Sequence, residues 1–134
     1  MALTIVLDTS PLSTVTKRQG VAEADACRRW VVDCRRAGHQ VLAPGIARLD
    51  AFCAVPGCYV SFTDAALRLA VKLWAQARNA GTPPADPKEL DCDVLIASQA
   101  LNLGAPRATL ILATMNPGHL AQFLPVDLWT NIVP

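Results

Sequence analysis

The sequence predicts an α/β fold, a three-layer α/β/α sandwich around a mainly parallel central sheet. Two stretches, LTIVL at residues 3–7 and ATLILAT at residues 108–114, are continuous apolar runs that include β-branched residues. Such runs are typical of strands buried on both faces of a parallel sheet. Amphipathic helical patterns alternate with the expected strands along the chain, and this alternation is characteristic of parallel α/β architectures.

The first half of the chain is expected to continue with a helix, a strand and a second helical segment. Residues 21–37 carry apolar side chains at helical spacing and stop before Gly38, a residue that suits a helix C-terminus. The apolar positions of this helix are Ala24, Cys27, Val31 and Cys34. Residues 39–44 predict a short strand. Pro44 is expected to begin a helical segment that Pro56 and Gly57 end, because proline is tolerated in the first turn of a helix.

The second half contains the clearest helical pattern, which runs from a plausible N-cap at Thr63 to Gly81. Its expected apolar face carries Leu67, Ala70, Val71, Trp74 and Ala77. The proline-rich residues 82–89 predict an exposed loop. A helix capped by Asp91 or Asp93 and ended by Gly104 is expected next. It is followed by the strand 108–114, a turn, and a last short strand within residues 124–129.

Length, charge and cysteine content favour one domain, residues 1–134, that binds neither membrane nor structural zinc. The net charge of +1 excludes a strongly basic surface, so binding of nucleic acid would depend on a local patch. No signal-peptide pattern or membrane span is found at the N-terminus, so we expect a cytoplasmic protein. The five cysteines lack CxxC spacing and are expected to be reduced core thiols: Cys27, Cys34, Cys53, Cys58 and Cys92.

Polar residues follow the expected strands at the positions where parallel sheets bind ligands. Asp8 follows the first strand, and Asn116 and His119 follow the strand 108–114. Asp50 lies in the helical segment after the second strand, and Asp93 begins a later helix. Because ligands gather at the carboxyl ends of the strands in an open parallel sheet, these side chains could converge there.

A cluster of carboxylates implies a bound cation, because the charges repel one another and lose hydration. Mg²⁺ takes oxygen ligands in octahedral geometry and often shares them with a substrate phosphate. It lowers the pKa of a bound water and stabilises the charge that grows on a phosphate during displacement. The pattern therefore indicates hydrolysis of phosphodiester bonds.

Four stretches of this chain resemble, in order and spacing, the PIN-domain nucleases, and most nearly the VapC-like toxin ribonucleases. They are VLDTSPL, APGIARLDAF, LDCDVLIASQAL, and LILATMNPGHL followed by LPVDLW. The resemblance runs from about residue 5 to residue 132 and implies a Mg²⁺- or Mn²⁺-dependent endoribonuclease that is the toxin of a type II toxin–antitoxin pair. It implies Asp8, Asp50 and Asp93 as metal ligands and Asn116 as the residue that positions water or substrate. It also implies an antitoxin partner and a homodimer.

Two positions depart from the family pattern. Asp50 stands where glutamate is usual, and Asn116 and His119 stand where the family places a fourth carboxylate. The shorter Asp50 side chain would reach a cation through water, and a neutral amide or imidazole adds no negative charge, so weak metal affinity is expected. The alternative function is a PIN-like domain with weakened or lost catalysis that binds RNA or a protein partner. A phosphatase-like domain is disfavoured, because Ser10 occupies the second acidic position of a DxD pair.

The same residues also have purely structural explanations. Asp8 and Asp93 could cap helices, and Asp91 competes with Asp93 for that role. Thr9 and Ser10 could bond Asp8 or a phosphate, or could cap a helix after Pro11.

Basic and aromatic residues on the expected helices are open to two explanations as well. The arginines of the helix 21–37 could follow a phosphate backbone, but a solvated helix face is favoured. They are Arg28, Arg29, Arg35 and Arg36. Trp30 and Trp74 fit a core or a subunit interface better than base stacking.

Overall fold

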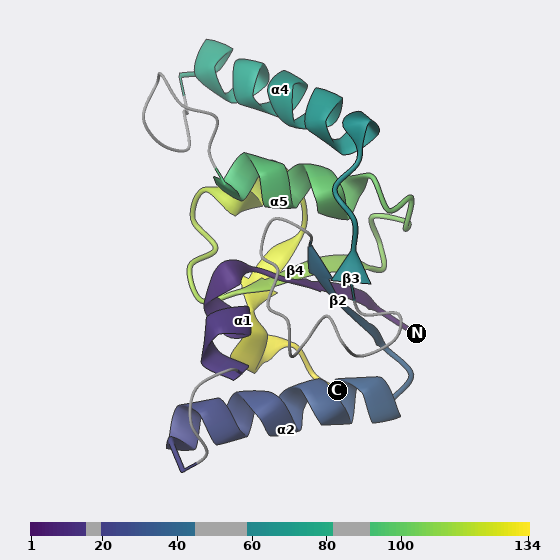
Figure 1. Ribbon diagram of the computed structural model, residues 1–134, viewed down its shortest axis with the longest axis vertical. Coiled ribbons are helices and arrows are strands. Elements are labelled where there is room, and N and C mark those ends of the chain that lie inside the picture. The colour runs from purple at the N-terminus through teal and green to yellow at the C-terminus, as the bar shows by residue number, and fades with distance from the viewer. Residues whose placement is uncertain (16–19, 45–58, 82–91) are drawn as a thin grey trace.

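The sheet contains five strands in the part of the chain that the computed structural model describes, residues 1–15, 20–44, 59–81 and 92–134 (Figure 1). The strands are β1 (Thr4–Leu7), β2 (Gln40–Pro44), β3 (Tyr59–Val60), β4 (Leu110–Thr114) and β5 (Val126–Leu128). Their order is β3-β2-β1-β4-β5, and each neighbouring pair is parallel. The predicted fold class, an α/β/α sandwich with a parallel sheet, is confirmed.

Helices cover both faces of this sheet (Figure 1). α1 (Thr9–Val15) and α2 (Ala22–Arg36) pack together on one side. On the other side α5 (Cys92–Leu101) contacts the sheet, and α4 (Asp64–Asn79) packs on the outer side of α5. Two short 3-10 helices, η2 (Leu120–Gln122) and η3 (Trp129–Asn131), flank β5. Within the described ranges, no helix has both the length and the apolar character needed to cross a membrane.

The central strand β1 is buried on both faces, as its continuous apolar sequence predicts. Ile5 and Leu7 pack in the core beneath α2, whereas Val6 packs in the core beneath α5. This alternation follows from the two-residue period of a strand. In the α2 core the rings of Trp30 and Trp129 lie 5.5 Å apart, and the Trp30 indole donates a hydrogen bond of 2.7 Å to the Ile132 carbonyl. Trp30 is therefore a core residue, as expected.

α5 is apolar around most of its circumference because it lies between the sheet and α4. Val94, Ile96 and Ala97 are fully buried. Gln99, also buried, donates through Nε2 to the Val60 carbonyl at 3.2 Å, which ties α5 to β3. The helix ends before Gly104, whose φ of +74° suits glycine, as the sequence predicts.

The buried face of α4 agrees with the predicted one in part, since Ala70 and Ala77 are buried and Trp74 is half-buried. Leu67 and Val71 are 42% and 50% exposed, although the periodicity placed them on the apolar face. The buried positions are Ala66, Ala70 and Ala77. Small side chains let α4 approach α5 closely, so packing buries the alanines and leaves the larger Leu67 and Val71 exposed at the border of the face.

Other expectations need correction or lie outside the described residues. Pro44 is the last residue of β2 and pairs with Val60, so it does not open a helix there. The helical segment expected from Pro44 to residue 55, apart from Pro44 itself, falls in the undescribed range 45–58. The short β3 was not predicted.

The structure also bears on the expected start of the first helix and on the cysteines. α1 begins at Thr9 and includes Pro11 within its first turn. Cys92 is exposed and not a core thiol, whereas Cys27 and Cys34 are buried and free.

Candidate active site

The candidate site lies between β1 and β4, where the winding of the sheet changes direction. From β1 the chain passes through α1 and α2 to β2 on one side, and later returns through α4 and α5 to β4 on the other. Neighbouring strands whose connections leave in opposite directions form a topological switch point, and a crevice opens outside their carboxyl ends. Asp8 directly follows β1, and Thr114 is the last residue of β4.

Asp8 is held firmly at this point. Its backbone N–H continues the sheet by donating to the Ala113 carbonyl at 2.9 Å. Its side chain accepts a hydrogen bond of 2.6 Å from the Thr114 hydroxyl, on Oδ2. Asp8 is 6% exposed and Thr114 is fully buried. A carboxylate that is almost fully buried requires hydrogen-bonding or ionic partners, and Thr114 is one of them.

The alternation along β1 and β4 indicates the face of the sheet on which this pair lies. Val6 and Leu112 are register partners, and both pack in the core beneath α5. Asp8 and Thr114 lie two residues further along each strand, so their side chains point to the same face. The Asp8–Thr114 pair is therefore on the α5 side of the sheet.

The segment after β4 is tied to the start of α1. The Met115 N–H donates to Ser10 Oγ at 3.3 Å, and the Asn116 N–H donates to Thr114 Oγ1 at 3.1 Å. The Asn116 side chain is exposed and Ser10 is half-buried. Asp8, Ser10 and Asn116, which sequence analysis selected separately, are thus joined through the residues at the end of β4.

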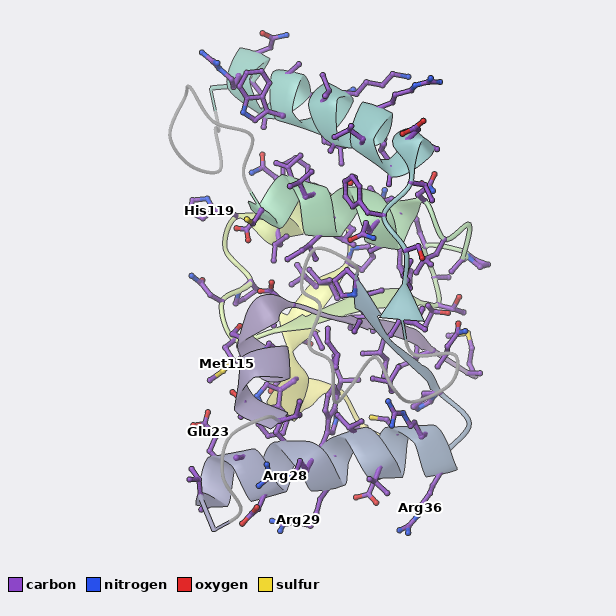
Figure 2. All side chains as sticks on the ribbon, viewed as in Figure 1. Glu23, Arg28, Arg29, Arg36, Met115 and His119 are labelled. Atoms are coloured by element: carbon purple, nitrogen blue, oxygen red, sulfur yellow. The ribbon has the colours of Figure 1, made fainter. Side chains whose placement is uncertain are left out.

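Asp93 lies in the first turn of α5 and is half-buried. The amino end of α5 is on the same side of the molecule as the carboxyl ends of β1 and β4 (Figure 1). α5 also contacts β4 and η2, and η2 follows His119 directly. His119 is exposed and extends outward on this side (Figure 2). Asp93 and His119 therefore share the edge of the sheet that holds Asp8.

Part of the predicted ligand set cannot be placed. Asp50, Asp91 and the side chain of Thr9 lie outside the described residues. In the part of the chain that is described, no three His, Cys, Asp or Glu side chains gather as a group that could hold a metal ion. The predicted set needs Asp50 as its third carboxylate. The donors that are described, two carboxylates and an amide, are hard oxygen ligands that suit Mg²⁺ or Mn²⁺.

Thr114 is the site residue that sequence analysis missed. In isolation a threonine at the end of an apolar run is an ordinary strand residue. The available signal was its position, because it ends the strand that neighbours β1 and directly precedes Met115 and Asn116. Its contact with Asp8 spans 106 residues, and only the pairing of β1 with β4 reveals it.

The arginines of α2 lie away from this site. Arg28 forms an ion pair with Asp25 and donates to the Val15 carbonyl at 3.0 Å, so it fastens α2 to the end of α1. Its hydrogen bond lowers the pKa of the Asp25 carboxyl. Arg29 and Arg36 are exposed on the side of α2 that faces away from the sheet (Figure 2). The α2 face of the sheet is opposite the face that holds Asp8, which favours the solvated-face explanation for these arginines.

Comparison with solved structures defines the class of fold. The chain is similar to the FitAcB crystal structure from Neisseria gonorrhoeae, with a TM-score of 0.63 and 16% identity over 96% of this chain and 100% of that chain. It is similar to VapBC2 from Rickettsia felis bound to a DNA fragment from their promoter, with a TM-score of 0.63 and 13% identity over 95% and 99% of the two chains. It is also similar to DNA-bound VapBC from Salmonella typhimurium, with a TM-score of 0.59 and 16% identity over 95% and 98%.

These similarities show a PIN-like fold of the kind found in VapBC and FitAB structures. No family model matches the sequence, and no curated protein matches it.

Proposed function

We propose that this protein is a metal-dependent endoribonuclease and the toxin of a toxin–antitoxin pair. One observation carries the proposal: a nearly buried carboxylate, Asp8, is held by Thr114 at the switch point of a PIN-like sheet. Asp93, in the first turn of α5, supplies a second carboxylate on the same side of the molecule. Negative charge concentrated at such an edge favours binding of a divalent cation.

Asp8, Asp93 and Asp50 are the residues that would hold Mg²⁺ or Mn²⁺. When bound, the cation would activate water and stabilise the charge that develops on the scissile phosphate. In the reaction, water adds to the phosphorus and one phosphorus–oxygen ester bond breaks. Because Asp8 is fixed through both its backbone and its carboxylate, little reorganisation is needed before the reaction.

Two polar side chains are available to orient the RNA. The exposed Asn116 amide can donate to and accept from a water or a phosphate oxygen. The Ser10 hydroxyl accepts the Met115 N–H, so its own proton can be donated to a phosphate oxygen. Neither side chain carries charge, so the proposed enzyme relies on the carboxylates for cation affinity.

The partners in this proposal are an RNA substrate, an antitoxin protein and a second copy of the chain. The similar solved structures are FitAcB and VapBC assemblies, which supports a protein partner. A small antitoxin gene directly upstream of the gene that encodes this chain would support the toxin assignment, and finding it requires no experiment on the protein.

RNA cleavage by the purified chain tests the nuclease proposal. The wild type should cut RNA in the presence of Mg²⁺ or Mn²⁺, and Asp8→Asn and Asp93→Asn should each lower the rate by about 100-fold or more, because each removes a ligand charge. Asp33→Asn is the matched control, since Asp33 is exposed on α2, on the other face of the sheet. It should cut at the wild-type rate.

A wild type that cuts no faster than the Asp8→Asn variant with either cation would refute the nuclease proposal. The alternative, a PIN-like module that binds RNA or a protein without cutting, would then be favoured. Asn116 in place of a fourth carboxylate is the feature that supports it.

A further inference from the structure

The most constrained polar group of the site is the Thr114 hydroxyl. Thr114 is fully buried, and its Oγ1 takes part in two hydrogen bonds. One joins it to Asp8 Oδ2 at 2.6 Å, and the other to the Asn116 backbone N–H at 3.1 Å. The three residues form a chain of hydrogen bonds that runs from the turn after β4 to the carboxylate after β1.

The direction of these bonds follows from the number of protons. A backbone N–H can only donate, so Asn116 gives its proton to Thr114 Oγ1. The hydroxyl has one proton, and the remaining partner is a carboxylate oxygen, so Thr114 donates to Asp8. A separation of 2.6 Å is typical of a hydroxyl that donates to an ionised carboxylate.

Neighbouring backbone restraints hold this chain of bonds in place. Thr114 is β-branched and belongs to a strand, which restricts rotation about its Cα–Cβ bond. Asn116 precedes Pro117, and the helical backbone region is disfavoured for a residue before proline. The donor that orients the hydroxyl is thus restrained by the sequence itself.

We propose that Thr114 is a positioning residue, whose hydroxyl fixes the rotation of the Asp8 carboxylate in the geometry that a divalent cation requires. This inference rests on the proposed cation site at Asp8. Residues that orient a metal ligand by a hydrogen bond typically contribute about 10- to 100-fold to metal affinity. We expect Thr114 to contribute to Mn²⁺ affinity in that range.

Two pairs of side chains at position 114, the wild-type Thr with Val and Ser with Ala, separate the hydroxyl from the shape of the side chain. Thr and Val have nearly the same shape and differ in the hydroxyl, and Ser and Ala differ in the same way at a smaller size. In calorimetric titrations of the chain with Mn²⁺, the proteins with a hydroxyl at position 114 should therefore bind Mn²⁺ more tightly than those without one. We expect Thr114→Ser to bind within about threefold of the wild type, and Thr114→Val and Thr114→Ala to bind roughly 10- to 100-fold more weakly.

A matched control makes the same chemical change elsewhere. Thr14 is 2% exposed, and its hydroxyl donates to the Ser10 carbonyl at 2.9 Å within α1. Thr14→Val should leave Mn²⁺ affinity unchanged. If Thr114→Val does not fold, as judged by its thermal transition, the comparison of Ser with Ala decides the question alone.

The proposal is overturned if all four side chains at position 114 give Mn²⁺ affinities within twofold of one another. It is also overturned if affinity follows size, with Thr and Val alike and Ser and Ala alike.

Parallel RNA-cleavage assays keep the two proposals, the nuclease and the role of the Thr114 hydroxyl, distinguishable. A wild type that binds Mn²⁺ through Asp8 and cuts no RNA refutes the nuclease while the hydroxyl effect on Mn²⁺ still stands. A wild type without Asp8-dependent Mn²⁺ binding refutes both.

Discussion

Asp8 shows how one residue can satisfy structural and chemical demands together. It continues the sheet through its backbone, directly precedes α1, and accepts a hydrogen bond from Thr114. A carboxylate is favoured at the amino end of a helix, so this position can stabilise α1 and bind a cation as well. The helix-cap and metal-ligand explanations of Asp8 are thus compatible.

The two buried cysteines of α2 give a prediction about pH. Burial raises the pKa of the Cys27 thiol from 9.0 to about 11, and that of the Cys34 thiol likewise to about 11. In the unfolded chain these thiols lose their protons near their ordinary pKa, whereas in the folded chain they keep them. The native state therefore binds more protons above pH 9, and the free energy of unfolding falls as the pH rises from 9.0 towards about 11.

Urea unfolding at pH 7.5 and at pH 10 measures this effect. Because lysine, tyrosine and other groups also titrate at high pH, the informative quantity is the loss of stability between the two conditions in each variant. Cys27→Ala should lose less stability on going to pH 10 than the wild type does. Cys92→Ala, which changes an exposed cysteine, should lose as much as the wild type. Equal losses in all three proteins would contradict this explanation.

At the scale of elements, α4 is where packing overrode sequence pattern. Ala70 is fully buried in the core between α4 and α5, and Val71 beside it is half exposed. Ala70→Leu should destabilise the protein by about 1–3 kcal/mol, because added methylene groups force α4 away from α5. Val71→Gln should change stability by no more than about 0.5 kcal/mol, since it is a surface substitution. The free energy of unfolding in urea checks both values, and the reverse ranking would show that Val71 packs in the core and Ala70 does not.

Strands and helices with long apolar patterns could be predicted from the sequence. Which of two neighbouring apolar stripes on one helix is buried could not. β1, β4 and α2 follow from continuous apolar runs or from helical spacing that Gly38 ends. The burial predicted for Leu67 and Val71 was wrong, because two adjacent stripes of α4 are apolar and only the partner helix selects between them. β3 has two residues, too few for any periodicity to indicate a strand.

At the scale of the whole molecule, the strand order determines the site. Apolar runs precede Asp8 and Asn116, so the sequence places both residues at carboxyl ends of strands. No sequence pattern reveals that β1 and β4 are neighbours, and that pairing is what joins Asp8 to Thr114. Thr114 was missed for this reason, whereas Asp93 was found because it begins a helix. The roles of these residues in binding metal stay predictions.

The position of bound Mn²⁺, determined by NMR, directly tests the proposed cation site at Asp8. Mn²⁺ broadens the signals of nearby nuclei, so substoichiometric Mn²⁺ added to the ¹⁵N-labelled chain shows where a cation binds. We predict that the amide signals of Ser10, Asp93 and Asn116 broaden first, while those of Gln40 and Gly104, which line a groove at the opposite end of the strands, stay sharp. Asp8→Asn should abolish this selective broadening. Broadening centred elsewhere, or unchanged in Asp8→Asn, would contradict a cation site at the switch point between β1 and β4.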